Sequence, residues 1–332
     1  MKTSKLGRNG PEIAAVGYGA MSFSDFYGPT NEAASHAILD AMRDWGVNHI
    51  DTSNVYGMGR SEEWIGSYFA RDPAAKDDFV IATKAGITRD SDGNRVFRND
   101  RAHLEGELDK SLKRMGVERV DLFYVHRRDP AMEIEAVTEA LVEIMKTGKI
   151  GAFGFSEIAP SSLRRAAAVH PVAAVQSEYS LQTRSPELGL VQACAELGTA
   201  LVAFSPVGRS LLTDHPLSRE AIAGAAFLAG NARFQEPNLG YNLAATDRFR
   251  ALATEMGEPA AALANAWLLA QGEHVIPIPG TRSVEHLREC VRGAEIALTA
   301  DDLRRIEEVL PVGWCHGDRY NESQWIGPER YC

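Results

Sequence analysis

Four residues of the chain have types that together could reduce a carbonyl group: Asp51, Tyr56, Lys84 and His126. Asp51 and Tyr56 lie in the segment HIDTSNVYG, residues 49–57, whereas Lys84 lies in FVIATKAG and His126 in DLFYVHR. Each segment begins with a short apolar run that is typical of a buried β-strand. In a barrel of parallel strands, catalytic residues gather at the C-terminal ends of the strands. The sequence therefore predicts that these four side chains meet there.

A tyrosine can protonate the carbonyl oxygen as a hydride reaches the carbon, provided that its pKa falls from about 10 towards neutrality. A lysine ammonium about 4 Å away stabilises the phenolate by about 4 kcal/mol at an effective dielectric constant near 20, which is enough for that fall if desolvation of the tyrosine does not cancel it. We therefore expect Lys84 to lower the pKa of Tyr56, Asp51 to hold Lys84, and His126 to donate a hydrogen bond to the carbonyl oxygen. Each residue taken singly is explained as well by a turn cap, loop packing or a core histidine. Their joint occurrence at three successive strand ends favours a site.

The elements that position these residues follow an alternating pattern. Strands are expected at VGYGAM (16–21), HIDTS, FVIATK, DLFYVH, IGAFGFS, VAAVQSEY, ALVAFSP and HVIPIPG. Amphipathic helices are expected near 34–45 with Thr30 as the cap, and near 62–69, 101–114, 134–146, 161–169, 187–197, 246–256 and 259–270. This pattern predicts an α/β fold, a (β/α)8 TIM barrel. A doubly wound sheet is the alternative, but VGYGAMSF lacks the third glycine of the GxGxxG fingerprint.

Several segments are additions to the barrel. TSKLG and EIAAVG can form an N-terminal hairpin, and a further helix begins near Thr299, beyond the eighth strand. Residues 207–245 interrupt the alternation after the seventh strand, and a tail follows from 311 to 332. Long connections in compact domains are usually functional. We expect residues 1–332 to form one domain in which 207–245 and 311–332 are substrate and cofactor loops.

Composition restricts the classes of partner. The chain has 332 residues, 45% of them hydrophobic, which suffices for one large core. Its net charge of −10, with both signs interspersed, argues against nucleic acid or an anionic membrane as a partner. No apolar run approaches the roughly 18 residues of a membrane span, so a cytoplasmic location is expected. Cys194, Cys290, Cys315 and Cys332 form no CxxC pair, and the histidines show no HExxH spacing, so free thiols and no metal are expected.

Six segments resemble the aldo-keto reductases over nearly the whole chain: HIDTSNVYGMGRSEEWIG, VIATKAG, DLFYVHRRDP, IGAFGFSE, VQSEYS and IPIPGTRSVEHLREC. The resemblance is closest to bacterial and fungal members that carry NARFQ and a segment like AFSPVGRS, a branch related to the channel β subunits. It implies a barrel that binds NADP(H) without a Rossmann domain. It also implies that Asp51, Tyr56, Lys84 and His126 are the catalytic tetrad.

The same resemblance implies which residues hold the nicotinamide half of the cofactor. Ser156 and Gln176 match the positions that bind the carboxamide, with Glu157 beside them where many members have Asn. Phe204 would stack on the nicotinamide ring, where many relatives have Tyr or Trp. The pyrophosphate would be lined by Ser205, Pro206, Gly208 and Leu211.

The loop after the eighth strand would hold the other half of the cofactor. Its residues that match family positions are Gly280, Thr281, Arg282, His286, Glu289 and Cys290. His286 replaces a frequent Arg, and Cys290 stands where Asn usually meets adenine. Arg282 is the best candidate for a 2′-phosphate, because its planar fork can make two charge-assisted hydrogen bonds at a helix N-terminus. NADPH is therefore expected in preference to NADH, although Arg282 could also be a solvated loop residue.

The substrate is expected to be a small carbonyl compound or alcohol. Phe23, Tyr27, Trp314 and Trp325 lie in loops near the expected barrel mouth and favour an apolar or ring-bearing compound, although surface packing explains them nearly as well. Arg127 and Arg128 could meet a charged substrate, or pair with Asp129 and Glu157.

The expected activity is NAD(P)H-dependent reduction of an aldehyde or ketone to an alcohol, with Tyr56 as the general acid. One alternative is an NAD(P)+-dependent dehydrogenase of a sugar or a pyridoxal-like alcohol. Another is a nicotinamide-sensing regulatory subunit, which is disfavoured because the long loops are not enriched in apolar runs.

Overall fold

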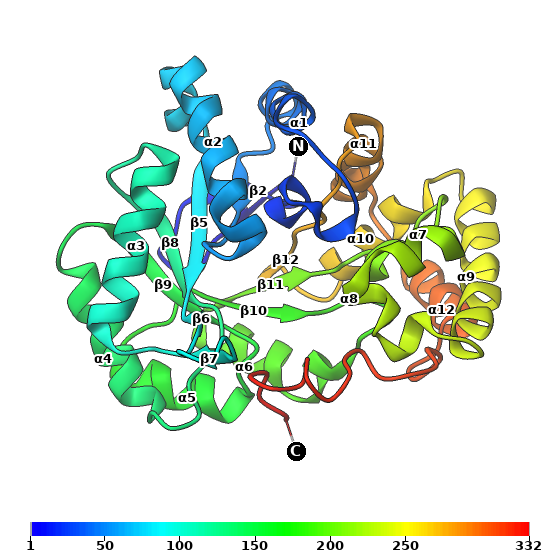
Figure 1. Cartoon of the computed structure of the whole chain (residues 1–332). Helices are drawn as coiled ribbons and strands as arrows, with labels where there is room; N and C mark the ends of the chain where they lie inside the picture. The colour runs from blue at the N-terminus through cyan, green and yellow to red at the C-terminus, as the bar shows by residue number, and fades with distance from the viewer. Residues whose placement is uncertain (1, 332) are drawn as a thin grey trace.

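Eight parallel strands form the centre of the computed structural model, which describes residues 2–331 (Figure 1). They are β3 (Tyr18–Gly19), β4 (His49–Asp51), β5 (Val80–Ala85), β8 (Val120–Val125), β9 (Ile150–Ser156), β10 (Ala174–Glu178), β11 (Ala200–Phe204) and β12 (Val275–Pro277). Their order in the sheet is β12-β11-β10-β9-β8-β5-β4-β3. Six of these strands lie within the segments predicted to be strands, whereas β5 ends one residue after FVIATK and β8 begins one residue before DLFYVH.

Backbone hydrogen bonds join the two ends of this sheet. The amides of Gly17 and Gly19 donate to the carbonyl oxygens of Pro277 and Pro279, each over 3.0 Å. A Cβ atom on Gly19 would lie only 2.8 Å from the carbonyl oxygen of Ile278, so the absence of a side chain permits this close approach. The sheet is thereby closed, and the predicted (β/α)8 barrel is confirmed.

Helices follow the strands and surround them (Figure 1). In chain order they are α1 (Glu32–Trp45), α2 (Arg60–Arg71), α3 (Arg101–Met115), α4 (Ile134–Met145), α5 (Pro160–Val169), α6 (Leu190–Leu197), α10 (Ala260–Leu269) and α11 (Val284–Arg292). The predicted cap of α1 was wrong by one residue, because Asn31 rather than Thr30 accepts a hydrogen bond from the amide of Ala34, over 2.9 Å. In residues 2–331, no helix combines the length and the apolar character needed to cross a bilayer.

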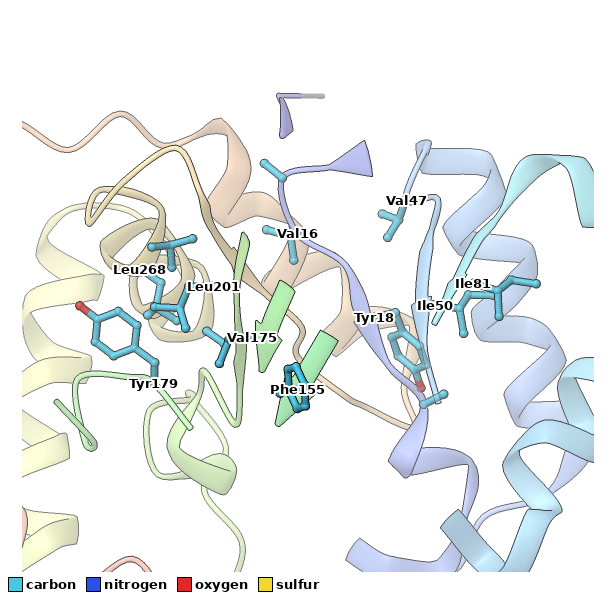
Figure 2. Packing of buried hydrophobic residues seen from close by; sticks show 14 of the residues in the cluster. Val16, Tyr18, Val47, Ile50, Ile81, Phe155, Val175, Tyr179, Leu201 and Leu268 are labelled. Atoms are coloured by element: carbon cyan, nitrogen blue, oxygen red, sulfur yellow. The ribbon is translucent and has the colours of Figure 1, made fainter. Parts of the chain in front are cut away.

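On strands such as β5 and β11, successive residues enter two separate apolar clusters. Ile50 and Ile81 are register partners on β4 and β5, and Val175 and Leu201 on β10 and β11; all four belong to the larger cluster between strands and helices (Figure 2). Their neighbours Ala82 and Val202 belong instead to the smaller cluster inside the barrel. The site must therefore lie beyond the packed interior, at an end of the barrel.

The predicted N-terminal hairpin is present as β1 (Thr3–Lys5) paired with β2 (Glu12–Ala14). Leu6 and Ile13 of this hairpin join the inner cluster, so the hairpin covers one end of the barrel. A second hairpin, β6 (Ile87–Arg89) with β7 (Arg95–Phe97), follows β5 and was not predicted. The thiols of Cys194, Cys290 and Cys315 are free, and Cys332 lies outside the described residues.

Residues 207–245 are more helical than the sequence suggested. They contain α7 (Arg219–Gly224), α8 (Ala226–Ala229) and the beginning of α9 (Asn238–Glu255), whose predicted start at 246 was wrong. Asn238, Gly240 and Asn242 are poor helix formers, but buried contacts such as those of Leu239 override that preference. Short 3-10 helices lie at 20–23, 25–27, 56–59, 73–78, 185–188, 208–210, 232–234 and 293–295.

The predicted C-terminal helix is α12 (Ala300–Val309), which Thr299 and Asp302 begin with reciprocal capping hydrogen bonds. The tail that follows runs back across the molecule (red in Figure 1). Glu329 pairs with Arg128 after β8, and its amide donates to the carbonyl oxygen of Glu157 after β9, over 2.8 Å. The tail therefore crosses the carboxyl ends of these strands.

Candidate active site

The structure brings Asp51, Tyr56, Lys84 and His126 together at the carboxyl ends of β4, β5 and β8. The Lys84 ammonium pairs with Asp51 and donates to the carbonyl oxygen of Thr52 over 2.8 Å. Its Nζ atom also lies 3.3 Å from the hydroxyl oxygen of Tyr56. The ring of His126 meets that of Tyr56 edge to face, with centroids 5.9 Å apart. Two charges and a phenol thus share one hydrogen-bonded cluster.

Lys84 and Asp51 are both buried. Burial opposes the charge on Lys84, but the attraction of Asp51 and the Tyr56 oxygen outweighs it, and the pKa of Lys84 is raised above its ordinary value. The second carboxylate oxygen of Asp51 accepts a hydrogen bond from Gln176 Nε2 over 2.7 Å. Lys84 is therefore a fixed positive charge at neutral pH.

The pKa of Tyr56 does not follow the sequence-based expectation. It is raised above 10, because burial of the phenol outweighs the attraction of Lys84, and the negative charge of Asp51 acts in the same direction as burial. The ion pair that holds Lys84 in place also cancels much of its field at Tyr56. In this structure Tyr56 is a protonated phenol, which suits a proton donor better than a proton acceptor.

The pKa of His126 is well below its ordinary value. Burial is the largest cause, and the positive charges of Arg127, Lys84 and Arg95 act in the same direction. Ser53 Oγ lies 3.1 Å from His126 Nδ1. Sequence reasoning missed Ser53, although its place between Asp51 and Tyr56 in HIDTSNVYG was a usable signal. The histidine is neutral, with one ring nitrogen engaged by a hydroxyl.

A cavity of about 650 Å³ opens beside this cluster. Its wall contains most of the predicted site residues: Tyr27, Asp51, Tyr56, His126, Arg127, Ser156, Gln176, Phe204, Ser205, Pro206, Gly280, Thr281, Arg282, His286, Glu289 and Cys290. In the closed barrel, three strands separate β8 from β12 in either direction. The cavity therefore reaches across the barrel end, from His126 after β8 to the loop after β12.

Three of the four aromatic residues expected near the substrate lie away from the cavity wall. Trp325 packs against Tyr320 and donates from Nε1 to Asp318 over 2.8 Å. Phe23 is buried in the larger apolar cluster, where its ring packs 5.2 Å from that of Tyr18. Trp314 packs at the edge of the same cluster and donates from Nε1 to the carbonyl oxygen of Leu181 over 2.8 Å. The loop positions of these aromatic residues were predicted, but their side chains pack against other residues of the protein.

Three of the predicted cofactor residues are also outside the wall. The Gly208 amide donates to the carbonyl oxygen of Ser205 over 3.0 Å, and Leu211 is buried among Ile222 and Leu228. In their place Val207, Arg209 and Ser210 line the cavity. The carboxylate of Glu157 is turned into a buried ion pair with Arg319.

That ion pair belongs to a cluster of five buried charged residues, Glu157, Glu178, Arg209, Arg233 and Arg319. Arg209 donates to Glu178 over 2.7 Å, Arg233 donates to the same carboxylate over 3.4 Å, and Arg319 contacts both glutamates. Burial alone would raise the pKa of Glu157, but the charge and hydrogen bonds of Arg319 lower it. Glu157 directly follows β9 and Glu178 is the last residue of β10, whereas the three arginines come from 207–245 and the tail. The cluster thus ties both additions to the strand ends.

Backbone strain gathers at the same end of the barrel. Glu157 and Ser205, which directly follow β9 and β11, have φ values of 59° and 51°. Arg209 and Ser210 have φ values of 54° and 83°. A left-handed conformation costs a residue with a side chain about 1 kcal/mol or more, and such residues are frequent at functional sites. Three of the four, Ser205, Arg209 and Ser210, line the cavity.

Several lining residues gave no usable signal in the sequence. Phe26, Phe227 and Tyr320 add aromatic surface, and the ring of His215 stacks on that of His286 with centroids 6.0 Å apart. Most of them come from 207–245 and the tail, which were predicted to reach the site. Neither segment has a periodicity that shows which side chains point inwards.

The fold is a TIM barrel, and charged and proton-donating side chains at its carboxyl end line a long cavity. This arrangement is typical of TIM-barrel enzymes that bind a cofactor and a small substrate. The model of the aldo/keto reductase family matches residues 15–311. The chain is 36% identical to the aldo-keto reductase yakc of Schizosaccharomyces pombe, whose name specifies NADP(+), over 96% of this chain and 94% of that one. It is 35% identical to probable aldo-keto reductase 1 of Glycine max, over 95% of this chain and 91% of that one. The chain belongs to the aldo/keto reductase family.

Solved structures show the same fold. The glycerol dehydrogenase AKR11B4 from Gluconobacter oxydans superimposes with a TM-score of 0.80 at 26% identity, covering 93% of this chain and 94% of that one. The aldo-keto reductase AKR11C1 from Bacillus halodurans, in its holo form, gives a TM-score of 0.77 at 24% identity, covering 98% and 99%. The second likeness is one of fold alone.

Proposed function

We propose that this protein reduces an aldehyde or ketone to the alcohol by direct hydride transfer from NADPH, with Tyr56 as the general acid. The arrangement of Asp51, Lys84 and Tyr56 beside a neutral His126, in the wall of one cavity, carries this proposal. Membership of the aldo/keto reductase family and the NADP(+) in the name of the yeast relative support it.

The residues of the cavity fit NADPH, which supplies the hydride when bound. Ser156, Gln176 and Phe204 would hold the nicotinamide end, next to the cluster. Arg282 lies at the N-terminal side of α11 and donates to the carbonyl oxygen of Pro29 over 3.0 Å. Among residues 2–331 it has no carboxylate partner within ion-pairing distance, so its guanidinium is available for a 2′-phosphate.

The chain's own groups provide the proton and its alignment. The phenol of Tyr56 donates its proton to the carbonyl oxygen, and the Lys84 ammonium stabilises the phenolate that remains. The contact of Ser53 Oγ with His126 Nδ1, over 3.1 Å, is shorter than its contact with the carbonyl oxygen of Lys84, over 3.4 Å. We therefore infer that the Ser53 hydroxyl donates its proton to His126 Nδ1. Nε2 of His126 then carries the ring proton and donates to the same carbonyl oxygen.

The long additions belong to this proposal. Arg209 and Phe227 from 207–245, and Tyr320 from the tail, line the cavity beside Phe204. Both segments would therefore shape the substrate and cofactor pocket within a single domain of residues 1–332. A cytoplasmic location is part of the same proposal.

The test is the consumption of NADPH with a panel of aromatic, aliphatic and sugar carbonyl compounds, with NADH as the control. We expect turnover of at least one aldehyde, with a higher kcat/KM for NADPH than for NADH. Binding of NADPH without turnover of any carbonyl compound, or of its alcohol in the reverse direction, would contradict the proposed activity.

The rate of carbonyl reduction is expected to be independent of pH from about 6 to about 9. Reduction requires a protonated Tyr56, and its raised pKa keeps the phenol protonated even above pH 9. It also requires a neutral His126, and the lowered pKa of His126 keeps the ring neutral even at a pH below the ordinary histidine pKa of about 6.5. Alcohol oxidation requires the phenolate instead, so its rate should rise across the same range. Profiles of kcat/KM against pH, in both directions, test this. A loss of reduction rate as the pH falls through about 6.5 would show that the pKa of His126 is not lowered. A loss of rate as the pH rises through about 8 would show that the pKa of Tyr56 is lowered rather than raised.

A further inference from the structure

Arg127 follows His126 directly, and its side chain forms part of the cavity wall. Its Nη1 atom donates to the carbonyl oxygen of His126 over 2.6 Å and to Ser156 Oγ over 3.0 Å. Both acceptors are neutral. Within residues 2–331, no carboxylate lies within ion-pairing distance of this guanidinium, which is half-buried beside the proposed reaction centre.

The anions that could have paired with Arg127 are engaged elsewhere. Glu157 is held by Arg319, and the carboxylate of Asp129 accepts a hydrogen bond from the amide of Ala131 over 2.9 Å. The next arginine, Arg128, shows the contrast, because it pairs with Glu329 and lies outside the cavity wall. Of the two consecutive arginines, only Arg127 lines the cavity, and among residues 2–331 it forms no ion pair.

The surroundings add further positive charge. Lys84 is balanced by Asp51, but the buried cluster sets three guanidinium groups against two carboxylates. Arg95 donates to the carbonyl oxygens of Ser323 and Ile326, and its pKa is lowered by burial and by repulsion from Arg127. The chain as a whole carries a net charge of −10. A local excess of positive charge in an acidic protein attracts an anion to this wall.

The cofactor does not account for this charge. Its 2′-phosphate is assigned to Arg282 after β12, and β12 stands across the barrel from β8, which Arg127 follows. Arg127 lies instead on the side of His126, where the carbonyl compound must bind if the proposed mechanism holds. An arginine in that position can bind a carboxylate or phosphate through two parallel hydrogen bonds.

We propose that Arg127 binds an anionic group of the substrate, so that the enzyme prefers carbonyl compounds that carry a carboxylate or a phosphate. This inference rests on the proposed function and names the substrate class of the same site. A neutral carbonyl compound can still meet Tyr56 and His126, but it leaves the guanidinium without a counter-charge.

The experiment compares matched substrates that differ in one charge. Carboxybenzaldehyde is set against its methyl ester, and glyceraldehyde phosphate against glyceraldehyde, at saturating NADPH. The quantity measured is the ratio of kcat/KM for the anionic member to that for the neutral member. Arg127→Met is compared with Arg128→Met, which removes the same charge one residue further on, and with Arg127→Lys, which keeps the charge but not the fork.

We expect the wild-type ratio to exceed one in at least one pair, and Arg127→Met to lower it by about 10- to 100-fold, mainly through KM, as removal of a charged hydrogen bond does. Arg128→Met should leave the ratio unchanged, and Arg127→Lys should retain part of it. Added salt should reduce the wild-type preference. A response confined to one pair identifies the anion as carboxylate or as phosphate.

An unchanged ratio in Arg127→Met, with neutral aldehydes still turned over, would overturn this inference and leave the proposed reductase activity standing. A loss of NADPH affinity in Arg127→Met, measured by fluorescence quenching, without a change in the ratio would overturn it in favour of a role in positioning the cofactor through Ser156. Failure of the wild type to reduce any carbonyl compound would overturn both proposals together. Thermal unfolding by circular dichroism confirms that each variant is folded.

Discussion

Tyr56→Phe is expected to slow carbonyl reduction by at least about 100-fold while NADPH still binds, because the variant loses the general acid and little else. The phenolic oxygen has its hydrogen-bond contact with Lys84, whose ammonium keeps Asp51 and the carbonyl oxygen of Thr52 as partners. The phenylalanine ring can still meet His126 edge to face. The fold and the ion pair should therefore survive.

The measurement combines single-turnover rates of NADPH oxidation with NADPH affinity from fluorescence quenching. Tyr27→Phe is the matched control, because Tyr27 lines the same cavity but is not a partner of Lys84. We expect that control to change the rate by less than about 10-fold, within the range of a lost hydrogen bond. Retention of more than about a tenth of the rate by Tyr56→Phe would exclude this tyrosine as the proton donor.

Lys84→Met is expected to lower the free energy of unfolding by about 3–5 kcal/mol and to abolish reduction. Lys84 and Asp51 are almost completely buried, so removal of the cation leaves a carboxylate that only Gln176 still contacts through a side-chain hydrogen bond. An unpaired buried charge costs more than the pair contributed. The double variant Lys84→Met with Asp51→Asn removes that charge too, and should recover most of the stability but none of the activity.

Urea denaturation of the wild type, both single variants and the double variant gives the four free energies required. Lys110→Met is the surface control: Lys110 pairs with Glu107 but is largely exposed, so its loss should cost less than about 1 kcal/mol. If Lys84→Met were as stable as the wild type, the buried pair would not be held as two opposite charges. If the double variant were active, Lys84 would have no part in the chemistry.

The barrel could be predicted from the sequence because its signals are local and repeated. Each strand is a short apolar run, and helices such as α1 and α3 end at Gly46 and Gly116 in the left-handed conformation. The meeting of Asp51, Tyr56, Lys84 and His126 could be predicted for the same reason, since residues at or just after the carboxyl ends of parallel strands share one end of a barrel.

What could not be predicted depends on contacts between distant segments. Nothing local to Glu157 shows that Arg319 reaches its carboxylate, and nothing in 207–245 shows that Phe227 lines the cavity while Leu228 is buried beneath it. The direction of the Tyr56 pKa shift was missed because the depth of burial of the phenol, which decides whether desolvation cancels the Lys84 charge, cannot be read from the sequence. Fields at a buried site follow from all neighbouring charges and from solvent access.

The cluster of five buried charged residues also sets an order of events during protein synthesis. Glu157 leaves the ribosome with the fifth barrel strand, long before its partner Arg319, which lies beyond all eight strands. Domains fold progressively as the chain emerges, but a carboxylate without its cation resists removal from water. The end of the barrel around Glu157 is therefore expected to stay hydrated until the segment that carries Arg319 has been translated. A chain translated only as far as the eighth strand would thus hold Glu157 without its cation at the rim of the candidate site.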